Sequence, residues 1–396
     1  MPFDKLPHEP TIALRPIKVS IPQAEVDDLQ SRLRSTRPFK RTFENSRKDE
    51  YHGVNLGWME EALRIWKDEY SWRDTEKEIN SHSNYIADLE HKGHKYQLHF
   101  IAFCSERSDA VPIIMTHGWP GSIIEFLPLL RHLQSTYTPS TLPAHIIVPS
   151  LIGYGFSGPP PLDATYGNVD QALLQDQLMR GLGFDKYVAQ GGDIGGFVTF
   201  KMGNVGKGCK AVHLNFCPSD RPEGFHDSTL DETDQALVKR QEETERVNMS
   251  YRDEHALKPA TIGFACDSDP IALLAWIGEK FLIWTDDDLP IPTILADVSL
   301  YWFTQCFSTA MWHYRASYGR EEDRNPDDLM TELREVPVGY SQFPKELFPS
   351  PAVWVKEKVD LVWHRRHDKG GHFAALEVPD VLWKDVMDFV GQVWKP

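Results

Sequence analysis

The stretch Tyr187-Val188-Ala189-Gln190-Gly191-Gly192-Asp193-Ile194-Gly195-Gly196 decides the fold. An apolar run typical of a buried strand leads into a glycine-rich corner, and a helix-like segment continues to Met202. The spacing Gly-x-Asp-x-Gly copies the nucleophile elbow written G-x-S-x-G, with aspartate in place of serine. Aspartate is also a good helix N-cap, but an N-cap does not need glycine on both sides. The glycines relieve crowding at a sharp turn and let a substrate approach closely, so we predict that Asp193 is a nucleophile.

The exchange of serine for aspartate changes the chemistry of the elbow. A serine attacks carbonyl carbons through its hydroxyl oxygen, whereas a carboxylate can attack an electrophilic sp³ carbon and leave an alkyl ester on the enzyme. The start of the following helix favours the ionised carboxylate. The motif therefore indicates covalent catalysis through an ester of Asp193.

Strand signals alternate with helix signals around the elbow. Lys92-Gly93 separates two alternating runs and predicts a hairpin. Alternation of strands and helices predicts an α/β fold with a mostly parallel sheet covered by helices on both faces. The predicted strands are Tyr85 to Leu89, Tyr96 to Phe103, Val111 to Met115, His145 to Pro149, Tyr187 to Gln190, Lys210 to Phe216, Val336 to Ser341, Ala352 to Val355 and Leu361 to Trp363.

The chain divides into four segments by pattern. Residues 1–82 form an N-terminal extension that we expect to be mostly helical, and residues 83–217 carry the first part of the core. Residues 218–318 are helix-rich and aromatic, which predicts a helical lid over the carboxyl edge of the sheet. Residues 319–396 return to strands and close with a helix from Pro379 to Val393.

Composition excludes several classes of function. The chain has 396 residues and a net charge of −16, which opposes binding to nucleic acid and to anionic membranes. Its five cysteines form no C-x-x-C pair, which favours a reducing compartment. Neither a signal peptide nor an apolar run of membrane-spanning length is visible. We expect a soluble, cytoplasmic protein.

Further candidate residues follow three predicted strands. The loop His117-Gly118-Trp119-Pro120-Gly121 can aim the N–H of Trp119 at the site, where it would form an oxyanion hole with the N–H of Ile194. An ordinary Gly-Pro turn is the alternative. His372, after Gly370-Gly371, is the best candidate for a general base. Glu346 follows a strand and could be the acid that orients this histidine, although a solvated surface charge explains it equally well. The order nucleophile, acid, histidine is that of the α/β-hydrolase triad.

Two other motifs resemble a metal site and a nucleotide site, but their surroundings in the sequence argue against both. His364, His367 and His372 could indicate a metal site, but an offset of three residues in an extended chain places the first two on opposite faces, so we expect no metal. The run Gly153 to Gly158 matches G-x-G-x-x-G after a strand. Three prolines follow it where a dinucleotide fingerprint needs a helix, so we reject a nucleotide site.

Taken together, these motifs resemble the α/β-hydrolase epoxide hydrolases, in particular the microsomal-type branch with its soluble fungal members. The resemblance covers almost the whole chain. It includes Trp66-Lys67-Asp68-Glu69-Tyr70 in the extension, and Lys258-Pro259-Ala260-Thr261-Ile262-Gly263 and Glu279-Lys280-Phe281 in the lid. Microsomal relatives carry a membrane anchor ahead of the extension; residues 1–21 show no such segment, so we do not expect a membrane location.

The resemblance implies an activity and two more residues. In this family two lid tyrosines donate protons, and matching the motifs places them at Tyr251 and Tyr314, with Tyr301, Tyr318 and Tyr340 as competitors of Tyr314. The implied reaction opens a small apolar epoxide to a vicinal diol without a cofactor. Haloalkane dehalogenases also use an elbow aspartate, but they typically place Trp directly after it, where this chain has Ile194. A catalytically silent receptor is the alternative of another class. The extension could clamp the lid or serve a homodimer, and the sequence leaves both open.

Overall fold

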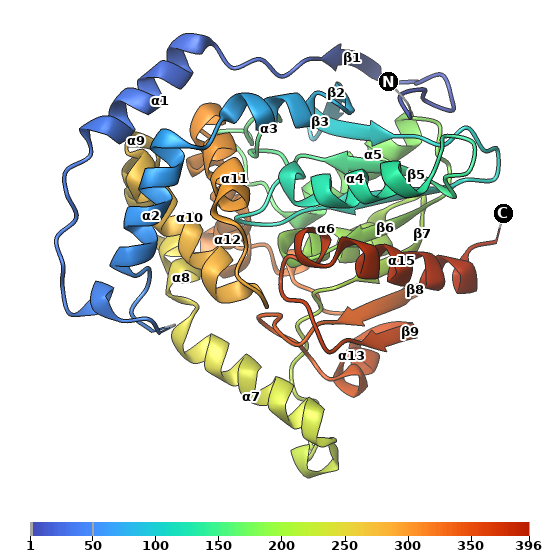
Figure 1. Ribbon diagram of the computed structural model, residues 1–396. Helices are drawn as coiled ribbons and strands as arrows, with labels where there is room; N and C mark the ends of the chain where they lie inside the picture. The colour runs from blue at the N-terminus through green and yellow to red at the C-terminus, as the bar shows by residue number, and fades with distance from the viewer. Residues whose placement is uncertain (1–2, 50, 396) are drawn as a thin grey trace.

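A twisted, mostly parallel sheet forms the centre of the protein (Figure 1). The computed structural model describes residues 3–49 and 51–395, in which nine strands pair in the order β1-β2-β3-β5-β4-β6-β7-β8-β9. Strands β1, β2 and β3 pair antiparallel, as does β3 with β5, and the remaining strands run parallel. The strands are β1 (Ala13–Ile17), β2 (Ser83–His91), β3 (His94–Phe103), β4 (Val111–Thr116), β5 (Ala144–Pro149), β6 (Tyr187–Gly191), β7 (Cys209–Leu214), β8 (Leu333–Gln342) and β9 (Val359–Arg366).

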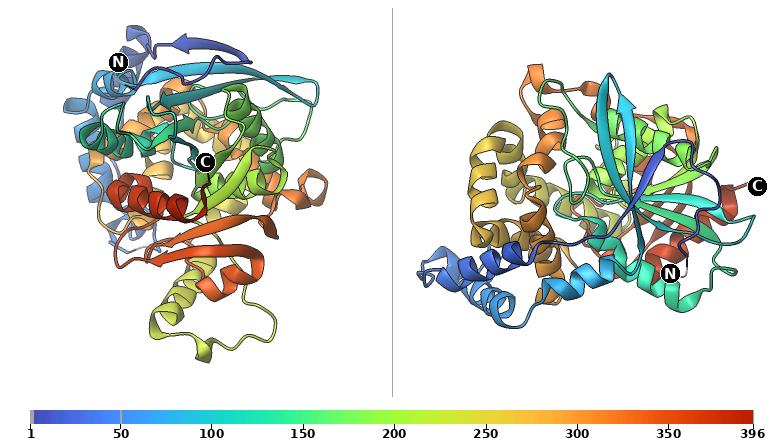
Figure 2. Two further views of the ribbon diagram at one scale, coloured as in Figure 1. Left: turned by 90° about the vertical axis from the view of Figure 1, so that its right-hand side faces the viewer. Right: turned by 90° about the horizontal axis from the view of Figure 1, so that it is seen from above.

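Helices cover both faces of this sheet. One side carries α4 (Leu127–Thr136) and α15 (Pro379–Val393), and the other carries α5 (Asn168–Gly181) and α6 (Asp193–Val205) (Figure 2). Every residue of the central strands β5 and β6 is buried, as expected for parallel strands between two helical layers. Two short helices, α13 (Ala352–Lys358) and α14 (Ala374–Glu377), complete this core. The predicted α/β architecture is confirmed.

A helical insertion separates β7 from β8. It lies beside the carboxyl ends of the parallel strands, and its longest helix projects from the body of the molecule (Figure 1). We call its six helices the lid: α7 (Glu232–Val247), α8 (Ser250–Leu257), α9 (Pro259–Ser268), α10 (Pro270–Trp284), α11 (Ile291–Thr304) and α12 (Trp312–Tyr318).

The N-terminal extension contacts both the sheet and the lid. It contains α1 (Gln23–Ser35), α2 (Leu56–Asp68) and α3 (Trp72–Ile79), and it also contributes the edge strand β1. On α2, the fully buried Trp66 donates its indole N–H to Ser299 Oγ of α11 at 3.1 Å. The sequence did not predict β1, because its residues are mostly exposed and include Pro16, so they carry no burial pattern.

Most predicted elements are confirmed, including the hairpin at Lys92-Gly93, but one is wrong. The predicted strand Ala352 to Val355 is the first turn of the helix α13. Trp354 and Val355 are both buried while Val353 is exposed, a pattern that helical spacing allows and strand alternation does not. Four apolar residues are too few to separate the two periods from sequence.

No helix within residues 3–49 and 51–395 is by itself long and apolar enough to cross a membrane. Only α9 and α10 together reach that length and composition, and they meet at a bend of 115°.

Candidate active site

Asp193 stands at a strained corner at the carboxyl edge of the sheet. It follows β6, begins α6 and has a φ of +50°, in the left-handed region that non-glycine residues rarely adopt. The glycines around it are required because a side chain at these positions would collide with neighbouring atoms. A Cβ at Gly195 would overlap the carbonyl of Thr116, and a Cβ at Gly118 would overlap the carboxylate of Asp193 itself. The elbow spacing therefore reflects a close backbone approach.

Two backbone N–H groups point at the Asp193 carboxylate. The N–H of Trp119 donates to Oδ1 at 2.7 Å, and the N–H of Ile194 donates to the same carboxylate. Burial raises the pKa of Asp193, but hydrogen bonds and charge from His372 together with these two N–H groups outweigh it, so the net shift is downward. The carboxylate is thus held ionised, next to two donors that could also bind an oxyanion.

His372 lies between Asp193 and Glu346, and all three side chains come together. Its Nδ1 is 2.5 Å from Glu346 Oε1, and its Nε2 is 3.3 Å from Asp193 Oδ2. Burial lowers the pKa of His372, but the two neighbouring carboxylates raise it by more. The net pKa therefore lies well above the usual range of a histidine. The Nε2 atom therefore faces the Asp193 carboxylate, and no other partner for it is present among the described residues.

The lid holds the loops that carry the histidine and the glutamate. The backbone N–H of His372 donates to the carbonyl of Trp284, the last residue of α10, at 2.9 Å. Arg240 of α7 donates to the carbonyls of Lys345 and Glu346 at 2.9 and 2.8 Å. The geometry of the triad therefore depends on the insertion as well as on the sheet.

Tyr251 and Tyr314 meet on the lid beside the nucleophile. They lie on α8 and α12, their ring centroids are 5.7 Å apart, and both rings contact the indole of Trp119. The Tyr251 ring stacks on Trp119 at 5.2 Å, and the Tyr314 ring meets it edge-on at 5.9 Å. Burial is the main reason why the pKa of both phenols lies well above the ordinary value. The charge of Asp193 raises the pKa of Tyr251 further, and the neighbouring Tyr251 raises that of Tyr314. The hydroxyls stay protonated at neutral pH.

The competing tyrosines have other partners. Tyr301 donates its hydroxyl to the carbonyl of Gly121 at 3.1 Å. Tyr318 faces the guanidinium of Arg252, and Tyr340 stacks on His364. The Tyr314 ring, by contrast, meets the rings of Tyr251 and Trp119 beside Asp193. This difference favours Tyr314 as the second donor.

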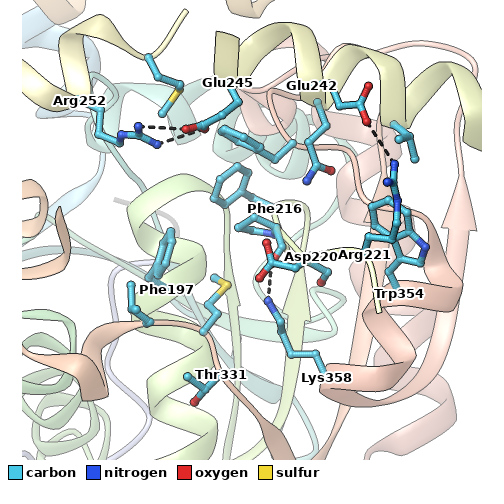
Figure 3. A pocket seen from close by; sticks show the side chains of 18 of the residues that line it. Phe197, Phe216, Asp220, Arg221, Glu242, Glu245, Arg252, Thr331, Trp354 and Lys358 are labelled. Atoms are coloured by element: carbon cyan, nitrogen blue, oxygen red, sulfur yellow. Dashed lines mark hydrogen bonds and ion pairs between the residues drawn. The ribbon is translucent and has the colours of Figure 1, made fainter. Parts of the chain in front are cut away.

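A pocket of about 920 Å³ opens between α7, α8 and the carboxyl ends of the strands (Figure 3). Asp193, His372, Tyr251 and Tyr314 are not among its lining residues, but Phe216 lines it, and the Phe216 ring is 5.8 Å from the His372 ring. Charged pairs stand at its rim, among them Arg252 with Glu245 (Figure 3). Apolar residues among its lining include Phe197, Phe216, Met249, Met330 and Phe348.

Sequence reasoning did not name these apolar lining residues. Two of them carry a signal that could have been used. Phe197 is one helical turn after Asp193 on α6, and Phe216 follows the carboxyl end of β7, where ligands bind in open α/β sheets. Met330 and Phe348 lie in irregular segments and carry no such signal.

Two histidines of the rejected metal motif have structural partners. His364 Nε2 is 3.0 Å from Gln342 Oε1, and His367 Nε2 is 2.5 Å from Asp385 Oδ2.

A buried carboxyl group at the boundary of core and lid contrasts with the nucleophile. Asp297 of α11 accepts a hydrogen bond from Ser122 Oγ at 2.5 Å, and its other oxygen has no partner among the described residues. Burial raises the pKa of Asp297 to about 7, and one hydroxyl donor only partly opposes this shift. Donor count and nearby charge, rather than burial, separate it from Asp193.

An ionised aspartate on an elbow, a histidine bound to a glutamate, and a parallel sheet with a helical insertion define a protein of the α/β-hydrolase fold. Comparison with families agrees: residues 111–214 match the alpha/beta hydrolase fold, and residues 14–126 match the family "Epoxide hydrolase N terminus".

Known proteins narrow the class. The chain is 42% identical to the structure of Aspergillus niger epoxide hydrolase, with complete coverage of both chains and a TM-score of 0.92. It is 37% identical to a putative epoxide hydrolase of Dothistroma septosporum over 98% of this chain and 92% of the relative. It is 29% identical to epoxide hydrolase 1 of Oryctolagus cuniculus over 96% of this chain and 89% of the relative. The chain belongs to the epoxide hydrolases of the α/β-hydrolase fold, in the microsomal-type branch that carries this N-terminal region.

Proposed function

We propose that this epoxide hydrolase works through a covalent ester on Asp193. Tyr251 and Tyr314 bind the epoxide oxygen while an Asp193 carboxylate oxygen attacks one ring carbon from behind. The new C–O bond forms as the ring C–O bond breaks, and a phenol transfers its proton to the departing oxygen. The proximity of both phenols to Trp119, and of Trp119 N–H to Asp193, supports this arrangement.

Ester formation would convert His372 from an acid to a base. Two carboxylates raise the pKa of His372, and esterification removes the charge of Asp193. The pKa then falls, and the proton released restores the phenol. The neutral imidazole takes a proton from water, and the hydroxide attacks the ester carbonyl while the N–H groups of Trp119 and Ile194 hold the oxyanion. Collapse releases the diol and regenerates the carboxylate.

The substrate we propose is a small apolar epoxide that reaches the site through the pocket beside Phe216. The aromatic and methionine side chains that line this pocket would provide apolar contact to the substrate. The neighbour of the nucleophile is Ile194, which offers no indole N–H to a halide, so the dehalogenase alternative loses its halide donor.

The observation that carries the proposal is the position of His372 between Asp193 and Glu346. Its test is His372→Gln, which removes the base but leaves the nucleophile. With styrene oxide, intact-protein mass spectrometry should show the mass of one substrate added, located on Asp193 by peptide mapping, and diol release should fall on the order of 10³-fold.

His367→Gln is the matched control, since it removes a partly buried, carboxylate-paired histidine outside the site. It should turn over styrene oxide without accumulating an adduct. Diol formation at the normal rate by His372→Gln, with no adduct, would contradict the ester mechanism.

A further inference from the structure

A buried cation faces one of the two lid tyrosines. Lys280 of α10 is only 3% exposed, and its Nζ lies 4.9 Å from the centroid of the Tyr251 ring. The same ammonium lies 5.3 Å from the Trp276 ring. Lysine is almost never fully buried unless it is paired, so its presence in a mostly apolar helix needs an explanation.

The groups around Lys280 stabilise its buried ammonium. Glu279 Oε1 is 3.0 Å from Nζ, and two aromatic faces contribute cation–π attraction. Burial lowers the pKa of Lys280, and the charge and hydrogen bond of Glu279 oppose this shift. The Glu279 side chain is 29% exposed, so solvent screens the carboxylate more strongly than the buried ammonium.

The histidine next to both tyrosines, His255, cannot supply a positive charge to their rings. His255 lies 4.9 Å from the Tyr314 ring and 5.7 Å from the Tyr251 ring. Its Nε2 accepts a hydrogen bond from Trp276 Nε1 at 2.9 Å. Burial, reinforced by the charge of Lys280, lowers the pKa of His255 to about 3, so the imidazole is neutral.

The other charges near Tyr251 are accounted for. Arg252, the next residue on α8, lowers the pKa of Tyr251 by its charge, but it is paired with Glu245 at 3.1 Å and lies over the Tyr318 ring. The Asp193 carboxylate acts in the opposite sense and opposes ionisation of the phenol. Lys280 differs from Arg252 because its ammonium lies over the Tyr251 ring itself.

We propose that Lys280 is a positioning residue for ring opening. Its ammonium stabilises the negative charge that develops on Tyr251 as this phenol donates its proton to the epoxide oxygen. Two unit charges at this separation interact strongly where water is excluded, and a phenolate spreads its charge into the ring that Lys280 faces. Lys280 touches neither the substrate nor Asp193, and it acts through Tyr251. The inference rests on the proposed role of Tyr251.

The test separates ring opening from ester hydrolysis. Lys280→Met keeps the length of the side chain and removes its charge. In single-turnover experiments with styrene oxide, formation of the Asp193 ester should slow about 10-fold or more, while hydrolysis of the accumulated ester changes less than about twofold. Lys280→Arg should recover most of the rate of ester formation. Lys280→Gln replaces the methionine variant if that protein does not fold.

Lys201→Met is the matched control. Lys201 is also buried, and its Nζ lies 5.5 Å from the Phe200 ring, but it is on α6 and faces no lid tyrosine. This variant should leave the ratio of the two rates unchanged. In a Tyr251→Phe background, Lys280→Met should have no further effect on ester formation, because the phenol through which it acts is missing.

Equal slowing of both steps by Lys280→Met, or the same loss in the Tyr251→Phe background, would overturn the inference and assign Lys280 to packing alone. Failure of the proposed mechanism looks different: the unaltered enzyme would then form no ester on Asp193.

Discussion

The triad and the tyrosine pair are held in the site by different forces. Asp193, Glu346 and His372 lie on loops at the sheet edge, and hydrogen bonds from backbone and side chains fix each of them. Tyr251 and Tyr314 lie on two lid helices. The Tyr251 ring stacks on Trp119, and the Tyr314 ring meets both of these rings edge-on. We therefore expect ester hydrolysis to depend on the triad at the sheet edge and on the lid contacts that hold its loops. Ring opening should depend in addition on the positions of the two lid tyrosines.

The largest effect should come from the nucleophile, which both steps need. Asp193→Ala should reduce diol formation on the order of 10⁵-fold and abolish the mass adduct, because no ester can form. Steady-state turnover of styrene oxide and intact mass measure both. Circular dichroism serves as the folding control, since alanine at a φ of +50° retains the backbone strain. Residual adduct in this variant would assign the nucleophile to another residue.

The tyrosine pair should affect one step only. Tyr251→Phe combined with Tyr314→Phe should slow ester formation on the order of 10³-fold, since no acid remains to protonate the departing oxygen. Hydrolysis of a preformed ester should stay within about threefold. Tyr318→Phe removes a neighbouring hydroxyl as the control. If both steps fell together, the separation of roles between sheet and lid would be wrong.

The triad acid should affect the other step. Glu346→Gln removes a charge that raises the pKa of His372, so the imidazole of the esterified enzyme loses protons at lower pH than in the unaltered enzyme. Hydrolysis requires the neutral imidazole and is lost as pH falls through this pKa, so its acid limb should move to lower pH. The maximal rate should fall about 100-fold, because the ring loses its orienting partner.

Stopped-flow measurements of both steps from pH 5 to 9 would check this prediction. Ester formation should stay level over that range, because the pKa of Asp193 lies below its ordinary value. An acid limb that moved to higher pH would contradict the assignment of Glu346.

The smallest effect concerns stability at the boundary of sheet and lid. Asp297 has a pKa of about 7, above its unfolded value, so its contribution to stability is present at low pH and is lost as pH rises through 7. Asp297→Asn cannot ionise. Between pH 5 and pH 8 the Tm of the variant should rise relative to that of the unaltered protein by about 3 °C. Calorimetry at both pH values measures the difference, and the exposed Asp288→Asn should show none.

The sequence predicted the triad better than the lid for a physical reason. Close backbone contacts at Gly118 and Gly195 leave little freedom in residue type, and such constraints are visible as motifs. Ring packing between helices far apart in sequence leaves no local pattern, so Tyr251 and Tyr314 depended on a family resemblance.

Lys280 and His255 could not be assigned from sequence, because their roles arise only when α8, α10 and α12 meet. Sequence alone also failed at Ala352 to Val355, where a predicted strand is a helix, and at the edge strand β1, which was not predicted. Both segments are short, and short segments take their conformation from tertiary contacts. The segment boundaries at residues 82, 217 and 318 stay predictions.

The N-terminal extension determines how the lid can move. One end is anchored to the sheet through the ladder between β1 and β2, and the other is anchored to α11 through the buried Trp66. Arg240 adds a third attachment between lid and core. A rigid swing of the whole insertion would have to break all three at once. We therefore expect substrates to exchange through local side-chain movements at the pocket beside Phe216, so that the width of this pocket limits which epoxides enter.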